Sequence, residues 1–210
     1  RDAQESRGLG DVYKRQRLNM YRDSTSVIGL AQDITDSVVE MRKIEYERDY
    51  DITTGLLNRR AFYYKFGRLF SAKKKLKTAA CFMFDLDNLK YVNDTYGHDF
   101  GDDYIRTAAS VFRLFESERS IVARLSGDEF ILFFYGYDNR KEIEKIKQRL
   151  QEKLRESYCV LPDGAHYKMR ASGGVAWYPK DAVDSDLLIK YADFAMYTVK
   201  HSTKGNIGEF

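Results

Sequence analysis

The sequence has few cysteines and no long apolar run, and both shortages exclude classes of protein. Its two cysteines, Cys81 and Cys159, lie far apart and outside any metal-ligand spacing, so neither a disulfide scaffold nor a zinc site is expected. No apolar stretch approaches the roughly 20 residues of a membrane helix, and no secretory signal opens the chain. We expect a cytoplasmic protein that makes no membrane contact through this chain, although a longer parent protein could carry an anchor.

Neither sign of charge dominates, because 35 basic and 32 acidic residues leave a net charge of +3 that is spread along the chain. The nearest approach to a basic patch, residues 73–77 (KKKLK), is expected to be a solvated loop. The sequence therefore predicts no nucleic-acid partner. With 43% hydrophobic residues, the chain can bury one good core and carry an extension.

The extension is expected at the N-terminus, in three parts. Residues 1–16 mix glycine with charges and are predicted to be disordered or a non-native leader. Residues 17–35 include a strand at 26–35, whose ending Gly-x-x-x-Asp-Ile-Thr resembles the last strand of a PAS sensor domain, so a remnant of such a domain is expected here. Residues 36–50 predict a helix with a thin apolar stripe. We favour a linker helix that pairs with its copy in a dimer over a lone solvated connector.

Residues 51–210 are predicted to form one domain. The near-continuous apolar run at 78–86 predicts a strand buried on both faces at the centre of a sheet, and residues 120–124 and 129–135 predict a hairpin. The other expected elements are helices at 59–70, 141–156 and 186–200, a turn and helix at 93–115, and strands at 158–161 and 167–177 around a turn at 162–164. This order predicts an α+β fold, with a mainly antiparallel central sheet flanked by helices.

Two acidic clusters stand at predicted strand ends. The segment RLSGDEFILFFY, residues 124–135, places Asp128 and Glu129 at the hairpin turn, and the apolar strand CFMFDLD ends in Asp85 and Asp87. If the strand ends lie side by side, three or four carboxylates converge, which is costly unless a cation such as Mg²⁺ neutralises them. Asp87 is either a further ligand or a supporting acid. A Gly-Asp turn alone is more often only a turn.

Four motifs in the family's order resemble the GGDEF domain, the catalytic module of diguanylate cyclases. They are DITTGLLNRR at 51–60, DLDNLKYVNDTYGHDFGD at 85–102, SGDEF at 126–130 and ADFAMYTVK at 192–200. The resemblance implies the palm-like α+β fold shared with nucleotide cyclases. It also implies condensation of two GTP molecules into cyclic dimeric GMP and pyrophosphate by a homodimer. The alternative is a catalytically silent GTP-binding module that regulates a partner.

The resemblance further implies a metal site formed by Asp85, Asp128, Glu129 and the carbonyl of Leu86. It would bind Mg²⁺, with Mn²⁺ as a substitute. Asp128 occupies the position of the family's proton acceptor, and the sequence leaves open whether it acts as a base or only as a metal ligand. Lys90 joins Asp128 and Glu129 in the implied catalytic set and is expected to reach a phosphate.

Three residues of the second motif concern the nucleotide base. Asn93 and Asp102 fit guanine recognition, because an amide pairs with purine acceptors and a carboxylate accepts from the ring N–H and the exocyclic amine. His98, in a Gly-His pair, is either a structural hydrogen-bonding group or, as the resemblance implies, a neighbour of the substrate. The sequence thus predicts selection of GTP over ATP.

The phosphates are expected to meet four further residues. Gly127 lets the backbone approach phosphate oxygens closely. Ser126 replaces the family's first glycine, and its turn is strained if that position requires a positive φ. Lys200 and Lys204 lie four apart and share a helix face if the last helix extends that far, with Lys204 standing where the family commonly has arginine.

Overall fold

The computed structural model describes residues 14–22, 24–160 and 164–210. The chain divides into two compact units, Arg1–Arg48 and Asp49–Phe210, each with its own sheet. Two predictions fall outside the described residues: the character of residues 1–13 and the turn at 162–163.

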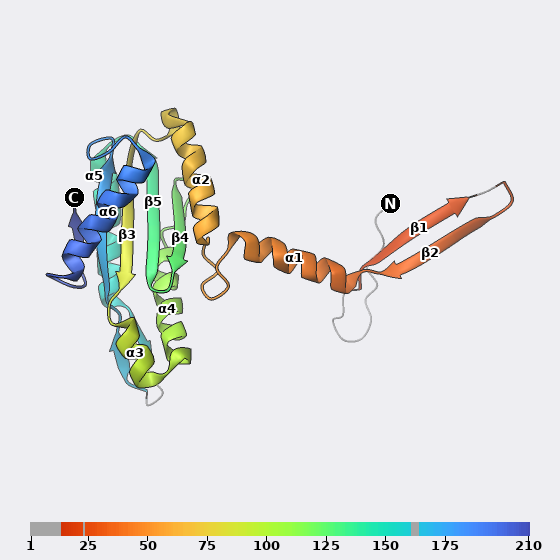
Figure 1. Cartoon of the computed structure of the whole chain (residues 1–210), viewed down its shortest axis with the longest axis horizontal. Helices are drawn as coiled ribbons and strands as arrows, with labels where there is room; N and C mark the ends of the chain where they lie inside the picture. Colours follow the sequence, from red (N-terminus) through yellow and green to blue (C-terminus); the bar gives the residue numbers. More distant parts are fainter. Residues whose placement is uncertain (1–13, 23, 161–163) are drawn as a thin grey trace. The chain divides into compact units, whose positions relative to one another are not determined.

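The first unit consists of a β-hairpin and a helix (Figure 1). Strands β1 (Gln16–Arg22) and β2 (Val27–Asp33) pair antiparallel, and helix α1 (Thr35–Asp49) follows them. β2 and α1 confirm the strand and helix predicted for this region, whereas β1 is an additional strand. The carboxylate of Asp33 accepts the backbone N–H of Thr35 at 3.0 Å, which stabilises the start of α1.

The second unit is built on a five-stranded sheet with the order β4-β5-β3-β8-β9 (Figure 1). Its strands are β3 (Thr78–Leu86), β4 (Ser120–Ser126), β5 (Glu129–Tyr137), β8 (Ala171–Tyr178) and β9 (Ile207–Glu209). β3 is central, as its apolar run predicts, because it pairs antiparallel with β5 on one side and with β8 on the other. β9 alone pairs parallel within this sheet, so the predicted mainly antiparallel α+β fold is confirmed.

Helices cover both faces of this sheet. They are α2 (Arg59–Ser71), η1 (Lys73–Lys75, a 3-10 turn), α3 (Leu89–Tyr96), α4 (His98–Arg113), α5 (Arg140–Glu156) and α6 (Ser185–Lys200). Phe82 and Phe84 of β3 pack with α4 and α5 on one face, whereas Cys81 and Met83 pack with α2 and α6 on the other. Alternate side chains of β3 therefore enter two different cores. In the described ranges no helix combines the length and apolarity that a membrane crossing requires.

The predicted strand at 167–177 is wrong in extent. Residues His166–Lys168 form β7, which pairs with β6 (Tyr158–Val160) in a separate two-stranded sheet, and β8 starts afresh at Ala171. The strand is interrupted where the backbone N–H of Arg170 donates to the hydroxyl of Tyr104 at 2.8 Å instead of to a neighbouring strand. A buried tyrosine from α4 thus divides a segment whose sequence pattern is continuous.

The region predicted as a turn and helix at 93–115 contains parts of two helices. α3 begins earlier, at Leu89, and Gly97 separates it from α4 with φ +88°, a conformation that favours glycine. The strand β9 was not predicted, because a segment of three residues is too short to show a recognisable periodicity.

Candidate active site

The hairpin turn between β4 and β5 is fixed to the end of the central strand. Asp85 of β3 lies opposite Glu129 of β5 in the sheet register. One residue further on, the backbone N–H of Leu86 donates to the carbonyl oxygen of Asp128 at 3.0 Å. The two acidic strand ends therefore lie side by side, as the sequence predicts.

Asp85 is buried at this edge, with 7% of its surface exposed. Its Oδ2 accepts a hydrogen bond from the Lys200 ammonium at 2.6 Å, while its Oδ1 is buried and has no hydrogen-bond partner in the described part of the chain. Burial raises the pKa of Asp85; the Lys200 ammonium opposes this, and the negative charges of Asp128 and Asp87 add to it. Burial alone would lower the pKa of Lys200, but the carboxylates, Asp85 first, raise it overall.

Asp87 has partners within the protein. The Ser172 hydroxyl lies 2.9 and 3.0 Å from its two carboxylate oxygens, and its backbone N–H donates to the carbonyl oxygen of Arg170 at 2.9 Å. Ser172 in turn accepts the backbone N–H of Gly205 at 3.2 Å. Of the two interpretations of Asp87, these contacts favour the supporting acid over the direct metal ligand.

Arg124 holds the hairpin turn, a role that the sequence did not reveal. Its guanidinium donates to the carbonyl oxygen of Gly127 at 2.8 and 3.0 Å, and also to the carboxylate of Asp51 at 3.1 Å. Gly127 has φ +42°, so the turn uses the freedom of glycine at this position. Both residues lie in or beside motifs that the sequence analysis identified: Asp51 opens the motif at 51–60, and Arg124 lies just before the motif at 126–130. The sequence spacing does not reveal that they form an ion pair.

Ser126 is not strained. Among the described residues other than glycine, a positive φ occurs at Lys77 and Asn88, and Ser126 is not one of them. Its hydroxyl donates to the Glu129 Oε2 at 2.9 Å, so the serine orients one of the candidate ligands. The strain considered for this position is therefore absent.

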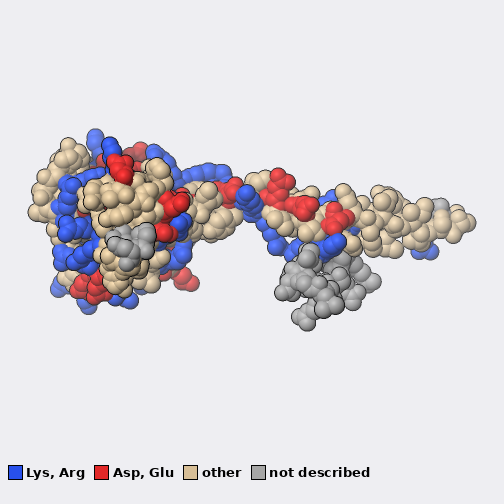
Figure 2. Space-filling model, turned by 90° about the horizontal axis from the view of Figure 1, so that it is seen from below, with Lys and Arg blue, Asp and Glu red and all other residues tan. Residues whose placement is uncertain are grey.

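Residues from the last helix complete the surroundings of the turn. Burial raises the pKa of Asp193, and the negative charge of Glu129 raises it further. Asp193 and Lys200 both lie on α6, and Lys200 pairs with Asp85. Figure 2 looks onto the end of the unit that carries α3, and there basic and acidic side chains are interspersed.

The predicted convergence of carboxylates is incomplete. In the part of the chain that the structure describes, no three His, Cys, Asp or Glu side chains form a ready metal centre. The reason is that Lys200 pairs with Asp85 and Ser172 bonds Asp87. The donors nevertheless fit a divalent cation, because Asp85 Oδ1 is a buried, unpartnered carboxylate oxygen next to the turn that carries Asp128.

The predicted guanine-binding residues lie around the α3–α4 junction. Asn93 is half-buried on α3 and packs closely against Gly101, where an added Cβ would lie 1.8 Å from the Asn93 Oδ1. Asp102 and His98 lie on α4 and are exposed. The absence of a side chain at Gly101 therefore allows α3 to pack closely against the first turns of α4 at Asn93.

The predicted lysines are dispersed. Lys90 is exposed in the first turn of α3. The prediction that Lys200 and Lys204 share a helix face is wrong, because α6 ends at Lys200 and Gly205, with φ +77°, follows in a turn. Lys204 instead lines a cavity beside β8. Lys200, expected at a phosphate, is paired with Asp85.

A mainly antiparallel sheet with helices on both faces, and acidic side chains where a hairpin meets the central strand, define an α+β domain with a candidate site at one edge of its sheet. The family described as "Diguanylate cyclase, GGDEF domain" matches residues 48–206. The chain therefore belongs to the GGDEF domain family.

Curated relatives and solved structures agree with this assignment. The chain is 31% identical over 195 residues to the cyclic di-GMP phosphodiesterase NbdA of Pseudomonas aeruginosa, covering 92% of this chain and 24% of that protein. It is 30% identical over 190 residues to the diguanylate cyclase DgcP of Escherichia coli, covering 90% of this chain and 50% of that protein. The crystal structure of the GGDEF domain of YfiN (TpbB) from Pseudomonas aeruginosa superimposes with a TM-score of 0.69 at 28% identity, covering 75% of this chain and 98% of that one.

The chain thus spans between a quarter and a half of these two curated relatives. Their names differ in activity, one being a phosphodiesterase and the other a cyclase. The comparisons show the family to which the chain belongs. Because the named activities of its relatives differ, the activity of this chain has to be argued from its own residues.

Proposed function

We propose that this chain is a diguanylate cyclase, which condenses two GTP molecules into cyclic dimeric GMP and pyrophosphate with Mg²⁺ in a cytoplasmic signalling protein. The observation that carries the proposal is the attachment of the hairpin turn to the end of β3, which brings Asp128 and Glu129 to the buried, unpartnered oxygen of Asp85. The similarity to DgcP, which is named a diguanylate cyclase, supports this proposal.

Asp85, Asp128, Glu129 and the carbonyl of Leu86 would hold Mg²⁺, for which Mn²⁺ could substitute. When bound, the cation would neutralise triphosphate charge and lower the pKa of the attacking hydroxyl. Lys200, which pairs with Asp85, and the exposed Lys90 would supply ammonium groups to the phosphates. The exposed Gly127 backbone can approach the phosphates closely.

The chemical task of the residues is positioning. The 3′-hydroxyl of one GTP must attack the α-phosphorus of the other, with pyrophosphate leaving in line. In this proposal Asp128 either accepts the proton of that hydroxyl or holds the metal that would acidify it. The Ser126 hydroxyl keeps Glu129 oriented beside it.

The test is to incubate the purified chain with GTP and Mg²⁺ and to identify the products by mass spectrometry. We expect cyclic dimeric GMP and pyrophosphate, and no product when the metal is chelated. The alternative, a silent GTP-binding module, is favoured by the Asp85–Lys200 ion pair, because the Lys200 ammonium already neutralises the carboxylate that would bind the metal. GTP binding without any product from a demonstrated dimer would establish that alternative.

Asn93→Ala is expected to weaken discrimination between GTP and ATP. Loss of a hydrogen bond from a half-buried amide corresponds to about 1 kcal/mol, or about fivefold in the ratio of affinities. The exposed position of Asp102 limits the contribution of its carboxylate. Calorimetric titration with both nucleotides measures the ratio, and Asp94→Ala, at the exposed neighbouring position on α3, is the control. An unchanged ratio would move the base-binding pocket elsewhere.

Ser126→Gly is expected to change turnover by less than about threefold, because serine at this turn has no positive φ to relieve and the glycine only adds chain entropy. Ser126→Ala serves as the matched variant, since it removes the hydroxyl that bonds Glu129 but keeps the Cβ. Steady-state product formation compares the three proteins. An increase above about tenfold in Ser126→Gly alone would show that the side chain obstructs the phosphates.

We also propose that catalysis requires a homodimer, since one such site holds one GTP and the reaction joins two. In this proposal residues 17–35 belong to a PAS-like sensor, residues 36–50 form a signalling helix and residues 51–210 are the GGDEF domain. Met41 and Ile44 of α1 lie three residues apart and are exposed, which supports a role of this helix in pairing.

Specific activity is therefore expected to rise with protein concentration. A helix of 15 residues is marginal as a lone dimerisation device, so the chain should be mostly monomeric at low micromolar concentration. Sedimentation and product assays over a concentration range of about a hundredfold measure this dependence. Deletion of residues 1–50 should lower activity further and leave GTP binding nearly intact. Constant specific activity from a demonstrated monomer would contradict the two-site mechanism.

A further inference from the structure

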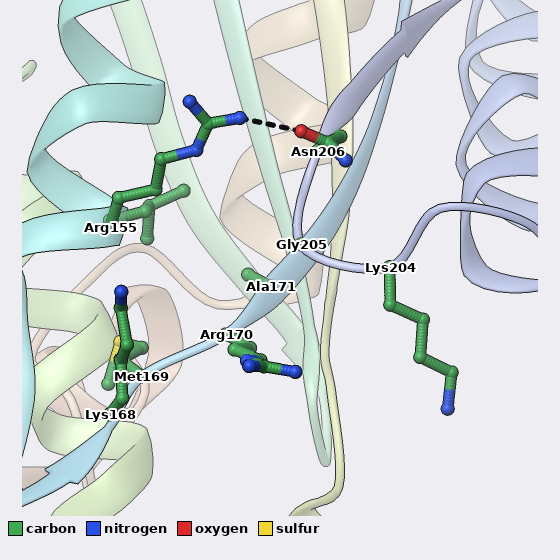
Figure 3. A pocket seen from close by; sticks show the side chains of 9 residues that line it. Arg155, Lys168, Met169, Arg170, Ala171, Lys204, Gly205 and Asn206 are labelled. Carbon is green, nitrogen blue, oxygen red and sulfur yellow. Dashed lines mark hydrogen bonds between the residues drawn. The ribbon is translucent and has the colours of Figure 1, made fainter.

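A basic cavity lies where the end of α5, the β7–β8 connection and the loop after α6 meet (Figure 3). Its volume is about 280 Å³. Four basic residues line it, Arg155, Lys168, Arg170 and Lys204, and its described lining includes no acidic residue. Basic and acidic residues are nearly balanced over the whole chain, so a cavity lined by basic residues and no acidic ones has an unusual local composition.

The floor of this cavity is separate from the candidate active site. Leu154, Met169 and Ala171 line it and belong to the core on the α4 and α5 side of the sheet. Asp85 instead pairs with Lys200 of α6, which packs on the opposite side. The cavity is therefore not the space around Asp85.

The cations of the cavity are not neutralised by the protein. For the side chains of Lys168, Arg170 and Lys204, the described residues provide no hydrogen-bond or ion-pair partner. Arg155 donates to the amide oxygen of Asn206 at 2.7 Å, a neutral group that fixes the guanidinium but leaves its charge uncompensated. Figure 3 shows this bond and shows the Lys204 side chain extending away from the other three.

The Arg155–Asn206 contact is itself supported. Asn206 accepts a second hydrogen bond, from the Gln151 side chain at 3.0 Å, and its own amide nitrogen donates to the carbonyl oxygen of Thr203 at 2.6 Å. The amide orientation is thus determined on both sides, so Arg155 is held in place before any ligand arrives. A pre-positioned guanidinium loses little entropy when it binds an anion.

We propose that this cavity binds a compact phosphate anion of the pyrophosphate type. A guanidinium group can donate two parallel hydrogen bonds to the oxygens of a phosphate. An ammonium group adds positive charge without requiring a particular orientation of the phosphate. The volume falls just below the roughly 300–1,000 Å³ of sites that enclose whole drug-sized ligands, which suits a diphosphate group rather than a complete nucleotide. This site goes beyond the proposed cyclase activity and does not depend on it.

The cavity is connected to the candidate active site through backbone hydrogen bonds. The carbonyl oxygen of Arg170 accepts the N–H of Asp87, and the N–H of Gly205 donates to Ser172, whose hydroxyl bonds the Asp87 carboxylate. An anion that draws Arg170 toward Arg155 therefore acts on atoms that hold Asp87. We expect the amide signal of Asp87 to report occupation of the cavity.

The first experiment localises binding in the unmodified chain. Inorganic pyrophosphate is titrated into the ¹⁵N-labelled protein in metal-free buffer with a chelator, and amide chemical shifts are followed. The proposal expects saturable shifts at residues 168–171 and 204–206 and at Asp87. Shifts confined to the hairpin turn between β4 and β5, or the absence of shifts at residues 168–171 and 204–206, would overturn it.

The second experiment uses matched charge reversals on exposed positions. Arg155→Glu combined with Lys168→Glu is expected to lower the affinity for pyrophosphate by about tenfold or more. The control combines Lys141→Glu with Lys145→Glu, two exposed α5 residues outside the cavity that produce the same change in net charge, and its affinity should stay within about twofold. Lys204 is left unchanged because it is a candidate substrate-binding residue. Equal losses in both double variants, or none in the first, would refute a defined site.

Discussion

Asp85→Ala and Asp128→Ala are each expected to lower the rate of cyclic dimeric GMP formation by a factor of about 10²–10³ or more, because either change removes a candidate metal ligand at the point where charge develops. Asp85 is the sharper probe, since its Oδ1 is buried without a partner. Product formation at saturating Mg²⁺ and GTP measures the loss. Retention of more than about a tenth of the wild-type rate by either variant would contradict the assigned role.

Asp85→Ala also leaves the Lys200 ammonium without its carboxylate, so the stability of this variant has to be measured separately. Asp85→Asn keeps the shape and removes the charge, and its activity should be as low as that of the alanine variant. Glu116→Ala, at an exposed carboxylate after α4, should retain full activity. A folded, inactive Asp85→Asn variant beside an active Glu116→Ala variant separates loss of chemistry from loss of structure.

Gly174→Ala is expected to destabilise the second unit by about 3 kcal/mol, the upper part of the range for overpacked cores. Gly174 lies on β8, and an added Cβ would lie 2.1 Å from the backbone nitrogen of Met196 and 2.2 Å from the carbonyl oxygen of Ala192. Both atoms belong to the backbone of α6, which cannot rotate out of the way as a side chain can. Urea unfolding measures the free energy, provided that the m-value is unchanged.

The matched control for this substitution is Gly67→Ala. Gly67 is an exposed residue inside α2, and an added Cβ there meets no atom within 4 Å. Since alanine is a better helix former than glycine, this variant should gain about 0.5–1 kcal/mol. If the two substitutions change the free energy of unfolding in opposite directions, the close approach of α6 to β8, rather than the residue type, causes the loss of stability at Gly174. An unchanged free energy of unfolding in Gly174→Ala would show that α6 can move away from the sheet.

The elements that the sequence predicts well have strong local signals. β3 is predicted with its observed bounds because its apolar run is nearly continuous, and α2 starts where predicted because the Asn58 side chain accepts the N–H of Ala61. The breaks between β7 and β8 and before α4 were harder to predict. The first depends on the Tyr104 hydroxyl, which comes from a helix far away in the sequence. β9 depends on a neighbouring strand rather than on its own three residues.

Some contacts of the candidate site could be predicted from the sequence and others could not. The approach of Asp85 to the hairpin turn could be predicted, because it follows from the pairing of two predicted strands. The Ser172–Asp87 and Lys200–Asp85 contacts do not follow, because they join residues 85 and 115 positions apart that share no periodic pattern. The position of Lys204 was not predicted for a related reason: the residue at which a helix ends is decided by tertiary packing.

Arg124 links the start of the second unit to the turn that carries Asp128. Asp51 lies two residues after the end of α1, and Gly127 immediately precedes Asp128. The largely buried guanidinium of Arg124 donates hydrogen bonds to both Asp51 and Gly127. One arginine side chain is therefore long enough to span the distance from the entrance of this unit to the acidic turn of the candidate site.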